Sequence, residues 1–377
     1  MDEPVTIGAM CVIGFPGRYV QGPGALSLLG TLTAELGARR PVLVSDDVVE
    51  RQLGDRVPQA LAAAGLPHCR LRFGGECTRA AVADLAAQAR AAGADAVIAL
   101  GGGKTIDTAK GVARELGAAL LVAPTVASND APTSRLIVLY DEAHRLVGVD
   151  MLARNPDVVL VDTAVIVRAP LRFFRAGIGD AISKRFEAAQ CAGSGGRNFF
   201  GGRPPDIAGV MADRCHAVIV RHGAQALAAV AAQQCDAAVE AVTEATVLLS
   251  GLGFESGGLS LSHALLRGLT AVPSLAGALH GEMVAFGTMV QLQLEQRPEA
   301  EQAAHAALLL GLGLPVTLEG LGQAELPAGL LDEVARLTMQ APYIGHFERP
   351  LTAPAIAQAV LAADARGRAL QAQRPAG

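Results

Sequence analysis

The stretch from Pro41 to Asp162 constrains the fold more than any other part of this 377-residue chain. Short apolar runs rich in β-branched residues alternate there with Ala-rich segments of helical periodicity. These runs read PVLVSDD, HCRLRFGG, DAVIALGGG, AALLVAPT and DVVLVDTAVI. Parallel strands need a crossover connection, which is usually a helix, so the alternation predicts a mainly parallel sheet covered by helices.

The rest of the chain is organised differently. Between Arg135 and Asp150, two β-type segments flank DEAHR with too little room for a crossover helix, which predicts a hairpin. After Val167 the strand signals stop, and from Ala176 onward Ala, Leu, Gly and Gln recur at helical spacing. We therefore expect an α/β domain at residues 1–166 and an all-helical domain at residues 167–377.

Composition narrows the class of partner. The net charge is -5 and the basic residues are scattered, so there is no basic stripe for nucleic acid, and a small-molecule partner is favoured. No uncharged apolar run reaches the ~18 residues of a membrane-spanning helix, and the acidic N-terminus lacks a signal-peptide pattern. Six dispersed cysteines without a CxxC motif indicate reduced thiols in a cytoplasmic protein, with neither a disulfide framework nor structural zinc.

The sequence ALGGGKTIDTAK, residues 99–110, follows an apolar strand and opens a helix. Glycines there allow backbone N–H groups to approach a phosphate at the helix N-terminus, so the run is typical of a pyrophosphate site. A Walker A loop would need glycine at Ile98, and the Rossmann fingerprint would need glycine or alanine at Ile106. A tight strand-to-helix turn without a ligand is the alternative, and Lys104 faces either phosphates or solvent.

Polar residues follow two other strands. Asp46 ends the strand PVLVSDD, where a carboxylate can accept both ribose hydroxyls and repel the 2′-phosphate of NADP, or can simply cap the next helix. A second group lies after a later strand, and it is either a binding loop or an ordinary polar turn. Its members are Thr125, Ser128, Asn129, Asp130, Thr133 and Ser134.

Two histidines, His263 and His280, lie in the apolar, Gly-rich stretch from Gly253 to Gly287. A buried imidazole needs a hydrogen-bond partner, a metal or a position on a cleft wall. Asp180 is expected at the start of a helix, where it is either an N-cap or a third ligand. Asp180 and the two histidines would leave the fourth position of a catalytic zinc open, but no local HExxH motif is present.

Six ordered motifs together resemble the glycerol dehydrogenases of the iron-containing alcohol dehydrogenase superfamily, which shares its fold with dehydroquinate synthase. They are PGRYVQGPGAL, GGGKTIDTAK, APTVASNDAPTS, AGIGDA, LLSGLGFESGGLSLSHAL and ALHGEMVAFGT. The resemblance spans Pro16 to about Arg366. It implies an N-terminal α/β NAD domain, a helical C-terminal domain, an active-site metal between them and a homo-oligomeric assembly.

The same resemblance assigns residues. Asp180, His263 and His280 would bind the metal, which is usually zinc in glycerol dehydrogenases and iron in many relatives. Asp130 would hold a substrate hydroxyl. The residues expected to contact NAD are Asp46, Gly102, Gly103, Lys104, Thr125, Ser128, Ser134, Leu136 and Tyr140. The reaction implied is hydride transfer from a small diol or polyol to NAD, aided by the metal as a Lewis acid.

Some positions depart from the family pattern. Leu266 and Arg267 stand where the usual motif has histidine and asparagine, Met283 replaces lysine, and Asn129 replaces threonine or serine. Leu266 and Met283 suggest a larger or less polar substrate, such as another alcohol, an amino alcohol or a hydroxy acid. A cyclase of the dehydroquinate synthase kind remains an alternative, although it calls for clustered basic residues beyond Arg267. A non-catalytic nucleotide-binding regulator would be expected to lack a metal ligand.

Overall fold

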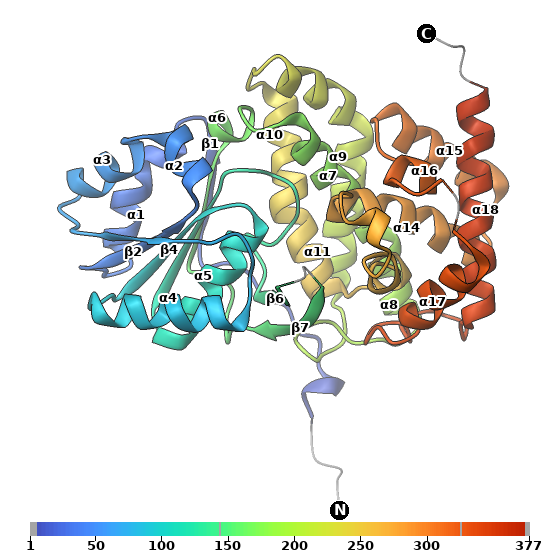
Figure 1. Ribbon diagram of the computed structural model, residues 1–377, viewed down its shortest axis with the longest axis horizontal. Helices are drawn as coiled ribbons and strands as arrows, with labels where there is room; N and C mark the ends of the chain where they lie inside the picture. The colour runs from blue at the N-terminus through green and yellow to red at the C-terminus, as the bar shows by residue number, and fades with distance from the viewer. Residues whose placement is uncertain (1–5, 143–144, 325, 374–377) are drawn as a thin grey trace, which may run out of the picture. The chain divides into compact units, whose positions relative to one another are not determined.

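The computed structural model describes residues 6–142, 145–324 and 326–373, which form two compact units (Figure 1). The α/β unit comprises Phe15–Phe174 and Ala228–Gly251, and the helical unit comprises Met1–Gly14, Arg175–Leu227 and Leu252–Gly377. The chain enters each unit more than once, whereas the predicted division at residue 166 gives each domain one continuous segment.

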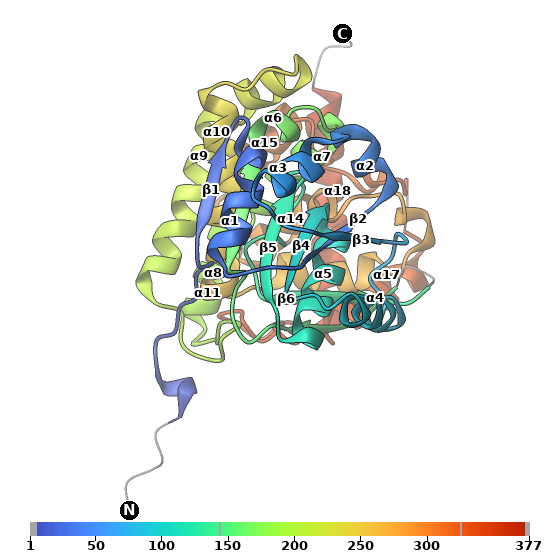
Figure 2. The same cartoon turned by 90° about the vertical axis from the view of Figure 1, so that its left-hand side faces the viewer.

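The α/β unit contains a six-stranded sheet in the order β1-β8-β5-β4-β2-β3, in which all neighbours are parallel (Figure 2). Its strands are β1 (Tyr19–Gly22), β2 (Pro41–Ser45), β3 (Cys69–Arg72), β4 (Ala96–Gly101), β5 (Ala119–Pro124) and β8 (Val158–Asp162). The predicted parallel sheet is therefore confirmed. The sequence did not predict β1, whose four residues end in a glycine and are only half-buried.

Helices cover both faces of this sheet (Figure 1). Along β2, Leu43 packs with the helices that precede β2 or follow it, and Val42 and Val44 pack with the two long helices on the opposite face. Because successive strand residues point to opposite faces, a strand buried on both sides is expected to be apolar, as β4 is throughout and β2 is up to its last residue, Ser45. The helices are η2 (Ala25–Leu28), α1 (Leu29–Glu35), α2 (Asp47–Leu53), α3 (Arg56–Ala63), α4 (Arg79–Ala91), α5 (Gly103–Leu116), α6 (Thr163–Ile166), α10 (Ala237–Glu244) and the π-helix η3 (Ala245–Leu249).

The register of the central strands brings three connections to one edge. Ser45 of β2 pairs with Leu100 of β4, and Gly101 pairs with Pro124 of β5. The loops that begin at Asp46, Gly102 and Thr125 therefore leave the sheet side by side at its carboxyl edge, where open α/β sheets bind ligands. The predicted hairpin is also confirmed, because β6 (Leu136–Tyr140) and β7 (Leu146–Met151) pair antiparallel.

The helical unit has no strand among its described residues, only an isolated bridge between Cys11 and Arg203. Its elements, including three helices with one end in the other unit, are η1 (Ile7–Ala9), α7 (Leu171–Ala181), α8 (Lys184–Gly193), α9 (Asp206–Ala231), α11 (Ser250–Gly257), α12 (Leu261–Ala264), α13 (Leu266–Leu269), η4 (Pro273–Leu275), α14 (His280–Leu294), α15 (Glu299–Gly311), α16 (Leu318–Leu321), α17 (Ala328–Thr338) and α18 (Ala353–Ala372). The prediction of a helical second half is confirmed.

One stretch of the described chain, Ala237–Gly257, is long and apolar enough to cross a membrane by length and composition alone. It is 67% buried inside the protein, and buried core helices satisfy the same criterion, so the stretch is weak evidence for a membrane span. The six cysteines all lie in described residues and form no disulfide, as predicted.

Candidate functional site

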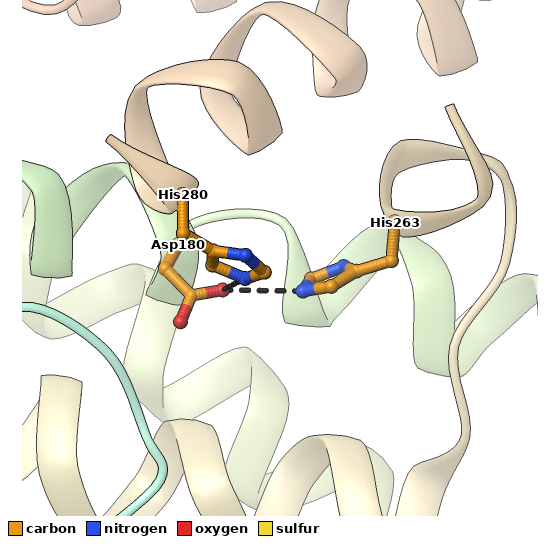
Figure 3. A group of neighbouring side chains, drawn as sticks. All are labelled: Asp180, His263 and His280. Atoms are coloured by element: carbon orange, nitrogen blue, oxygen red, sulfur yellow. Dashed lines mark ion pairs between the residues drawn. The ribbon is translucent and has the colours of Figure 1, made fainter. Parts of the chain in front are cut away.

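Three predicted ligands, Asp180, His263 and His280, lie together in the helical unit (Figure 3). Asp180 Oδ1 is 3.2 Å from Nε2 of His263 and 3.6 Å from Nε2 of His280. One ligand atom from each residue lies within 4.8 Å of the other two. Asp180 is fully buried, and its second oxygen, Oδ2, has no hydrogen-bond partner, whereas the His280 side chain is 43% exposed. The group is therefore open on the side of His280.

Glycines allow the helices to approach closely enough for this geometry. A Cβ on Gly179 would lie 2.4 Å from the carbonyl oxygen of Gly281, so α7 and α14 touch through their backbones beside Asp180 and His280. A Cβ on Gly287 would lie 2.7 Å from the carbonyl oxygen of Ser262, which brings α12 and its His263 against α14 in the same way. The motifs AGIGDA and HGEMVAFG thus supply two of the three ligands together with the close helix packing.

Asp180 does not lie at the start of a helix, so that prediction is wrong. It is the penultimate residue of α7, which begins after Pro170 and runs through Gly177 and Gly179. The two glycines weakened the helical signal in the sequence, but the contact with α14 compensates for their low helix propensity. The capping interpretation of Asp180 is excluded with it.

Glu187 of α8, which the sequence analysis left without a role, holds His263. Nδ1 of His263 donates to Glu187 Oε2 at 2.6 Å, and the backbone N–H groups of Ser260 and His263 both donate to Oε1 at 3.0 Å. With Nδ1 as donor, the lone pair of Nε2 points toward Asp180. Glu187 follows Asp180 by seven residues, a spacing that places two residues on one face of a helix. This spacing is the sequence signal that could have identified Glu187 as part of the site.

Lys184 is the second residue that the sequence analysis missed. Its ammonium, Nζ, donates to Asp180 Oδ1 at 2.6 Å and to His263 Nε2 at 3.1 Å, and it lies 5.4 Å above the ring of Phe254. The side chain is fully buried. A lysine four residues after an aspartate is a common helical ion pair, but such pairs are usually exposed.

These charges set the ionisation of the group. Burial alone would raise the pKa of Asp180, but Lys184, His280 and His263 hold it well below its usual range. Burial alone would also raise the pKa of Glu187, but the nearby His263 and Lys184 lower it below its usual value. Burial lowers the pKa of His263, yet Glu187 outweighs it and raises the value to about 8. An ammonium can only donate, so the 3.1 Å contact of Lys184 with Nε2 requires a neutral ring, and protonation of His263 would break that contact.

In the α/β unit, the glycine run forms the connection from β4 to α5. Gly102 is the N-cap of α5, and the carbonyl of Gly101 accepts from the backbone N–H of Thr125 at 3.0 Å. A Cβ on Gly103 would lie 2.7 Å from Nδ2 of Asn129. The first N–H groups of a helix have no partner within it, so this end of α5 offers donors and positive partial charge to an anion.

The side chain of Lys104 is 44% exposed, in keeping with the solvent-facing alternative. Its ammonium pairs with Glu76 at 2.7 Å and lies 5.2 Å above the ring of Tyr140. Asp46 caps α2, since its Oδ1 accepts from the N–H groups of Val48 and Val49 at 2.8 and 2.9 Å. The capping interpretation of Asp46 is therefore confirmed. Both hydrogen bonds use the oxygen Oδ1 and neither uses Oδ2.

The loop after β5 is held from within the unit. Asp130 is buried, and its Oδ2 accepts from Ser250 Oγ at 2.8 Å. Thr133 Oγ1 donates to the carbonyl of Val247 at 2.9 Å. Among the other predicted residues, Thr125 and Ser134 are buried, Ser128 is half-buried, and Leu136 and Tyr140 lie on β6.

A buried lysine ties this loop to α5. Lys110 Nζ donates to the carbonyl of Leu136 at 2.7 Å, lies 3.4 Å from Ser134 Oγ and pairs with Asp107 Oδ1 at 3.2 Å. Burial raises the pKa of Asp107 despite that pair. Burial, followed by the nearby Asp107 and Glu76, also raises the pKa of Tyr140. Two of the predicted cofactor contacts, Ser134 and Leu136, are thus fixed by a residue that the sequence did not single out.

Comparison with known proteins identifies the family. The iron-containing alcohol dehydrogenase pattern matches residues 16–163. A glycerol dehydrogenase of Escherichia coli is 37% identical over 358 residues, which cover 95% of this chain and 97% of that protein. This chain belongs to the iron-containing alcohol dehydrogenase family. A glycolaldehyde reductase of Halobacterium salinarum is 41% identical, with coverage of 94% and 97%.

Solved structures of this alcohol dehydrogenase family agree. A probable glycerol dehydrogenase from Sinorhizobium meliloti is 39% identical, with a TM-score of 0.90 and coverage of 96% of this chain and 100% of that one. Glycerol dehydrogenase from Schizosaccharomyces pombe is 32% identical, with a TM-score of 0.94 and coverage of 97% and 93%. The predicted family and fold are confirmed, and the protein is an oxidoreductase of the glycerol dehydrogenase type.

Proposed function

We propose that this chain uses NAD and one divalent metal to oxidise a secondary hydroxyl of glycerol or a related small diol to the ketone. In this reaction the carbinol C–H and O–H bonds break, a C=O bond forms, NAD becomes NADH by accepting the hydride, and one proton is released. Membership of the family implies both cofactors. The observation that carries the proposal is the convergence of Asp180, His263 and His280, one ligand atom each, within 4.8 Å.

These residues fit a divalent metal. A carboxylate oxygen and two imidazole nitrogens are a common set for catalytic zinc, which keeps a further position open. The unpartnered, buried Oδ2 of Asp180 is a lone-pair donor with no other role in the described structure. A metal held there supplies Lewis-acid charge that favours loss of the alcohol proton. We propose zinc, with iron as the alternative, bound through Asp180, His263 and His280.

We propose that NAD binds at the carboxyl edge of the sheet, where the connections after β2, β4 and β5 emerge together. The start of α5 provides N–H groups for the pyrophosphate, and Asp46 provides a carboxylate for the ribose hydroxyls that disfavours a 2′-phosphate. The proposed contacts are Asp46, Gly102, Gly103, Lys104, Thr125, Ser128, Ser134, Leu136 and Tyr140.

Substrate choice is proposed to depend on a few side chains. Ser250 fixes the carboxylate of Asp130, which would hold a second substrate hydroxyl. Leu266 and Met283 are buried close in sequence to the ligands, whereas Arg267 is exposed. Because two apolar side chains replace polar ones of the usual motif, we expect a preference for diols longer or less polar than glycerol.

A panel of glycerol, longer 1,2-diols and amino alcohols, assayed with NAD and zinc or iron through NADH absorbance, tests the proposal. We expect metal-dependent NADH formation and higher kcat/KM for a longer diol. No NADH with any alcohol would overturn the function, and equal or greater preference for glycerol would overturn the role of Leu266 and Met283. A second candidate function is reduction of a small hydroxyaldehyde, suggested by the similarity to the glycolaldehyde reductase of Halobacterium salinarum. Adding glycolaldehyde with NADH tests it.

Two further properties belong to the same proposal. We place the enzyme in the cytoplasm, consistent with six cysteines that form no disulfide. We also propose a homo-oligomer, because α9 exposes the apolar side chains of Ile207, Val210 and Val220. Gel filtration with light scattering measures the assembly directly, and a monomer at assay concentration would contradict it.

A further inference from the structure

A buried ammonium contacts two of the three proposed ligand residues. Lys184 Nζ lies 2.6 Å from Asp180 Oδ1 and 3.1 Å from His263 Nε2, and both side chains of the ion pair are at most 1% exposed. The helical spacing of four residues directs Lys184 and Asp180 to the same face across the break between α7 and α8. The ammonium therefore occupies a definite place in the site rather than a solvated surface.

The charges explain why it lies there. Asp180 and Glu187 are two fully buried carboxylates, and their oxygens lie 3.2 Å and 2.6 Å from the imidazole nitrogens of His263. A buried charge is costly unless it is paired and hydrogen-bonded. Lys184 neutralises Asp180 in this arrangement, while Glu187 accepts hydrogen bonds from the His263 imidazole and from two backbone N–H groups. The ligand group can therefore stay ordered in the metal-free protein.

A metal needs the same atoms. The lone pair of His263 Nε2 that accepts from Lys184 is the pair that would bind a metal, and Asp180 Oδ1 lies even closer to the ammonium. A cation that shares both atoms with a divalent metal is repelled by it at short range in a site with little solvent. The metal and the ammonium cannot occupy this position together.

We propose that Lys184 is an intramolecular competitor for the metal: its ammonium holds the ligand residues in the metal-free protein and is displaced when the metal binds. The face of Phe254, 5.4 Å from Nζ, offers a cation–π surface along which the flexible side chain can withdraw. Lys184 thereby lowers metal affinity and keeps the empty site folded. This inference rests on the metal site of the proposed function.

The test compares the wild type with Lys184→Met, which keeps the apolar stem, and Lys184→Gln, which keeps a hydrogen-bond donor for Asp180. The matched control is Arg185→Met, which removes the next positive charge along α8; Arg185 is half exposed and pairs with Asp213 at 3.0 Å. Zinc affinity of each metal-stripped protein is measured by competition with a chromogenic chelator. Thermal unfolding is recorded with and without zinc.

Both Lys184 variants are expected to bind zinc more tightly than the wild type by about tenfold or more, the scale on which neighbours of ligands act. Their metal-free forms are expected to have a lower melting temperature, and zinc is expected to raise that temperature more than it does in the wild type. Arg185→Met is expected to change neither the zinc affinity nor the melting temperature. Zinc affinity in both Lys184 variants that is equal to or weaker than that of the wild type overturns the inference. Failure of every protein, including the wild type, to bind zinc or iron would instead overturn the proposed metal site.

Discussion

Glu187 contacts His263 twice, through the imidazole Nδ1 at 2.6 Å and through the backbone N–H at 3.0 Å. The double contact fixes both the position of the residue and the tautomer of its ring, since a carboxylate only accepts. A carboxylate behind a histidine ligand is a common way to orient the ring and raise its basicity toward a metal. We therefore propose that Glu187 would act through His263 on a metal bound there.

Replacing Glu187 with Gln is expected to weaken zinc binding by about 10–100-fold, the usual range for such partners. The glutamine amide can donate to Nδ1, which would move the ring proton to Nε2 and remove the lone pair that the metal needs. Chelator competition on the metal-stripped protein measures the affinity. Glu295→Gln is the control, because Glu295 is equally buried but pairs with Arg297. A similar loss in both variants would mean that Glu187 acts only through stability.

Asp46 allows its two functions to be separated. Asp46→Ser keeps a strong N-cap for α2 but removes the negative charge, whereas Asp46→Ala removes both. We expect the ratio of kcat/KM with NADP to that with NAD to rise at least roughly tenfold in both variants, since removing a charge repulsion of even about 1.4 kcal/mol has that effect. Only the alanine variant should lose about 1 kcal/mol of stability in denaturant unfolding. An unchanged ratio in Asp46→Ser would leave Asp46 with a capping role alone.

Gly102 and Gly117, at the two ends of α5, distinguish a phosphate site from a simple turn. Gly102 has φ −87° and ψ −175°, which alanine tolerates, and a Cβ there meets only Val126 at 3.3 Å. Gly102→Ala is expected to weaken NAD binding, measured by NADH fluorescence titration, with little change in stability. Gly117 has φ +66°, so Gly117→Ala should cost about 1 kcal/mol and leave NAD affinity unchanged. A loss of stability in Gly102→Ala with unchanged NAD affinity would support the turn without a ligand.

Two histidines, the buried His305 and the half-buried His216, predict a stability loss in mild acid. Burial lowers the pKa of His305 to about 3 and that of His216 to about 4, from an ordinary value of 6.5. Below pH 6.5 these histidines bind protons in the unfolded chain but stay neutral in the folded protein. The free energy of unfolding therefore falls by up to about 1.4 kcal/mol per pH unit for each histidine. The loss extends to about pH 4 for His216 and about pH 3 for His305.

His305→Leu removes one of these two contributions, together with the unpartnered Nε2 of that ring. Urea unfolding of the wild type and the variant at about pH 7 and about pH 5 should show a smaller decline for the variant. The same decline in both proteins would show that His305 is protonated in the folded state.

The sequence predicted what depends on local pattern. Alternating apolar runs were enough to predict the parallel sheet, and the short DEAHR connection was enough to predict the hairpin. The strand β1 was missed because its pairing with β8 spans most of the α/β unit. Asp180 was misplaced because its helix contains two glycines, which only the contact with α14 explains.

The contacts that the sequence did not predict join residues that lie far apart in the chain. Lys104 pairs with Glu76, 28 residues earlier, and Lys110 reaches the carbonyl of Leu136 after the next strand. Glu187 meets His263 across 76 residues. Such pairs follow from the packing of whole elements, so a single sequence shows that the charged residues are present but not which atoms they meet.

The most direct test of the central claim is to measure bound metal and NADH formation together in His263→Ala and in the wild type, each loaded with zinc and supplied with a 1,2-diol and NAD. The account predicts that the variant loses both the metal and the alcohol-dependent reduction of NAD while remaining folded by circular dichroism. A folded variant that keeps its metal and forms NADH at the wild-type rate would contradict the assignment of Asp180, His263 and His280 as the catalytic metal site.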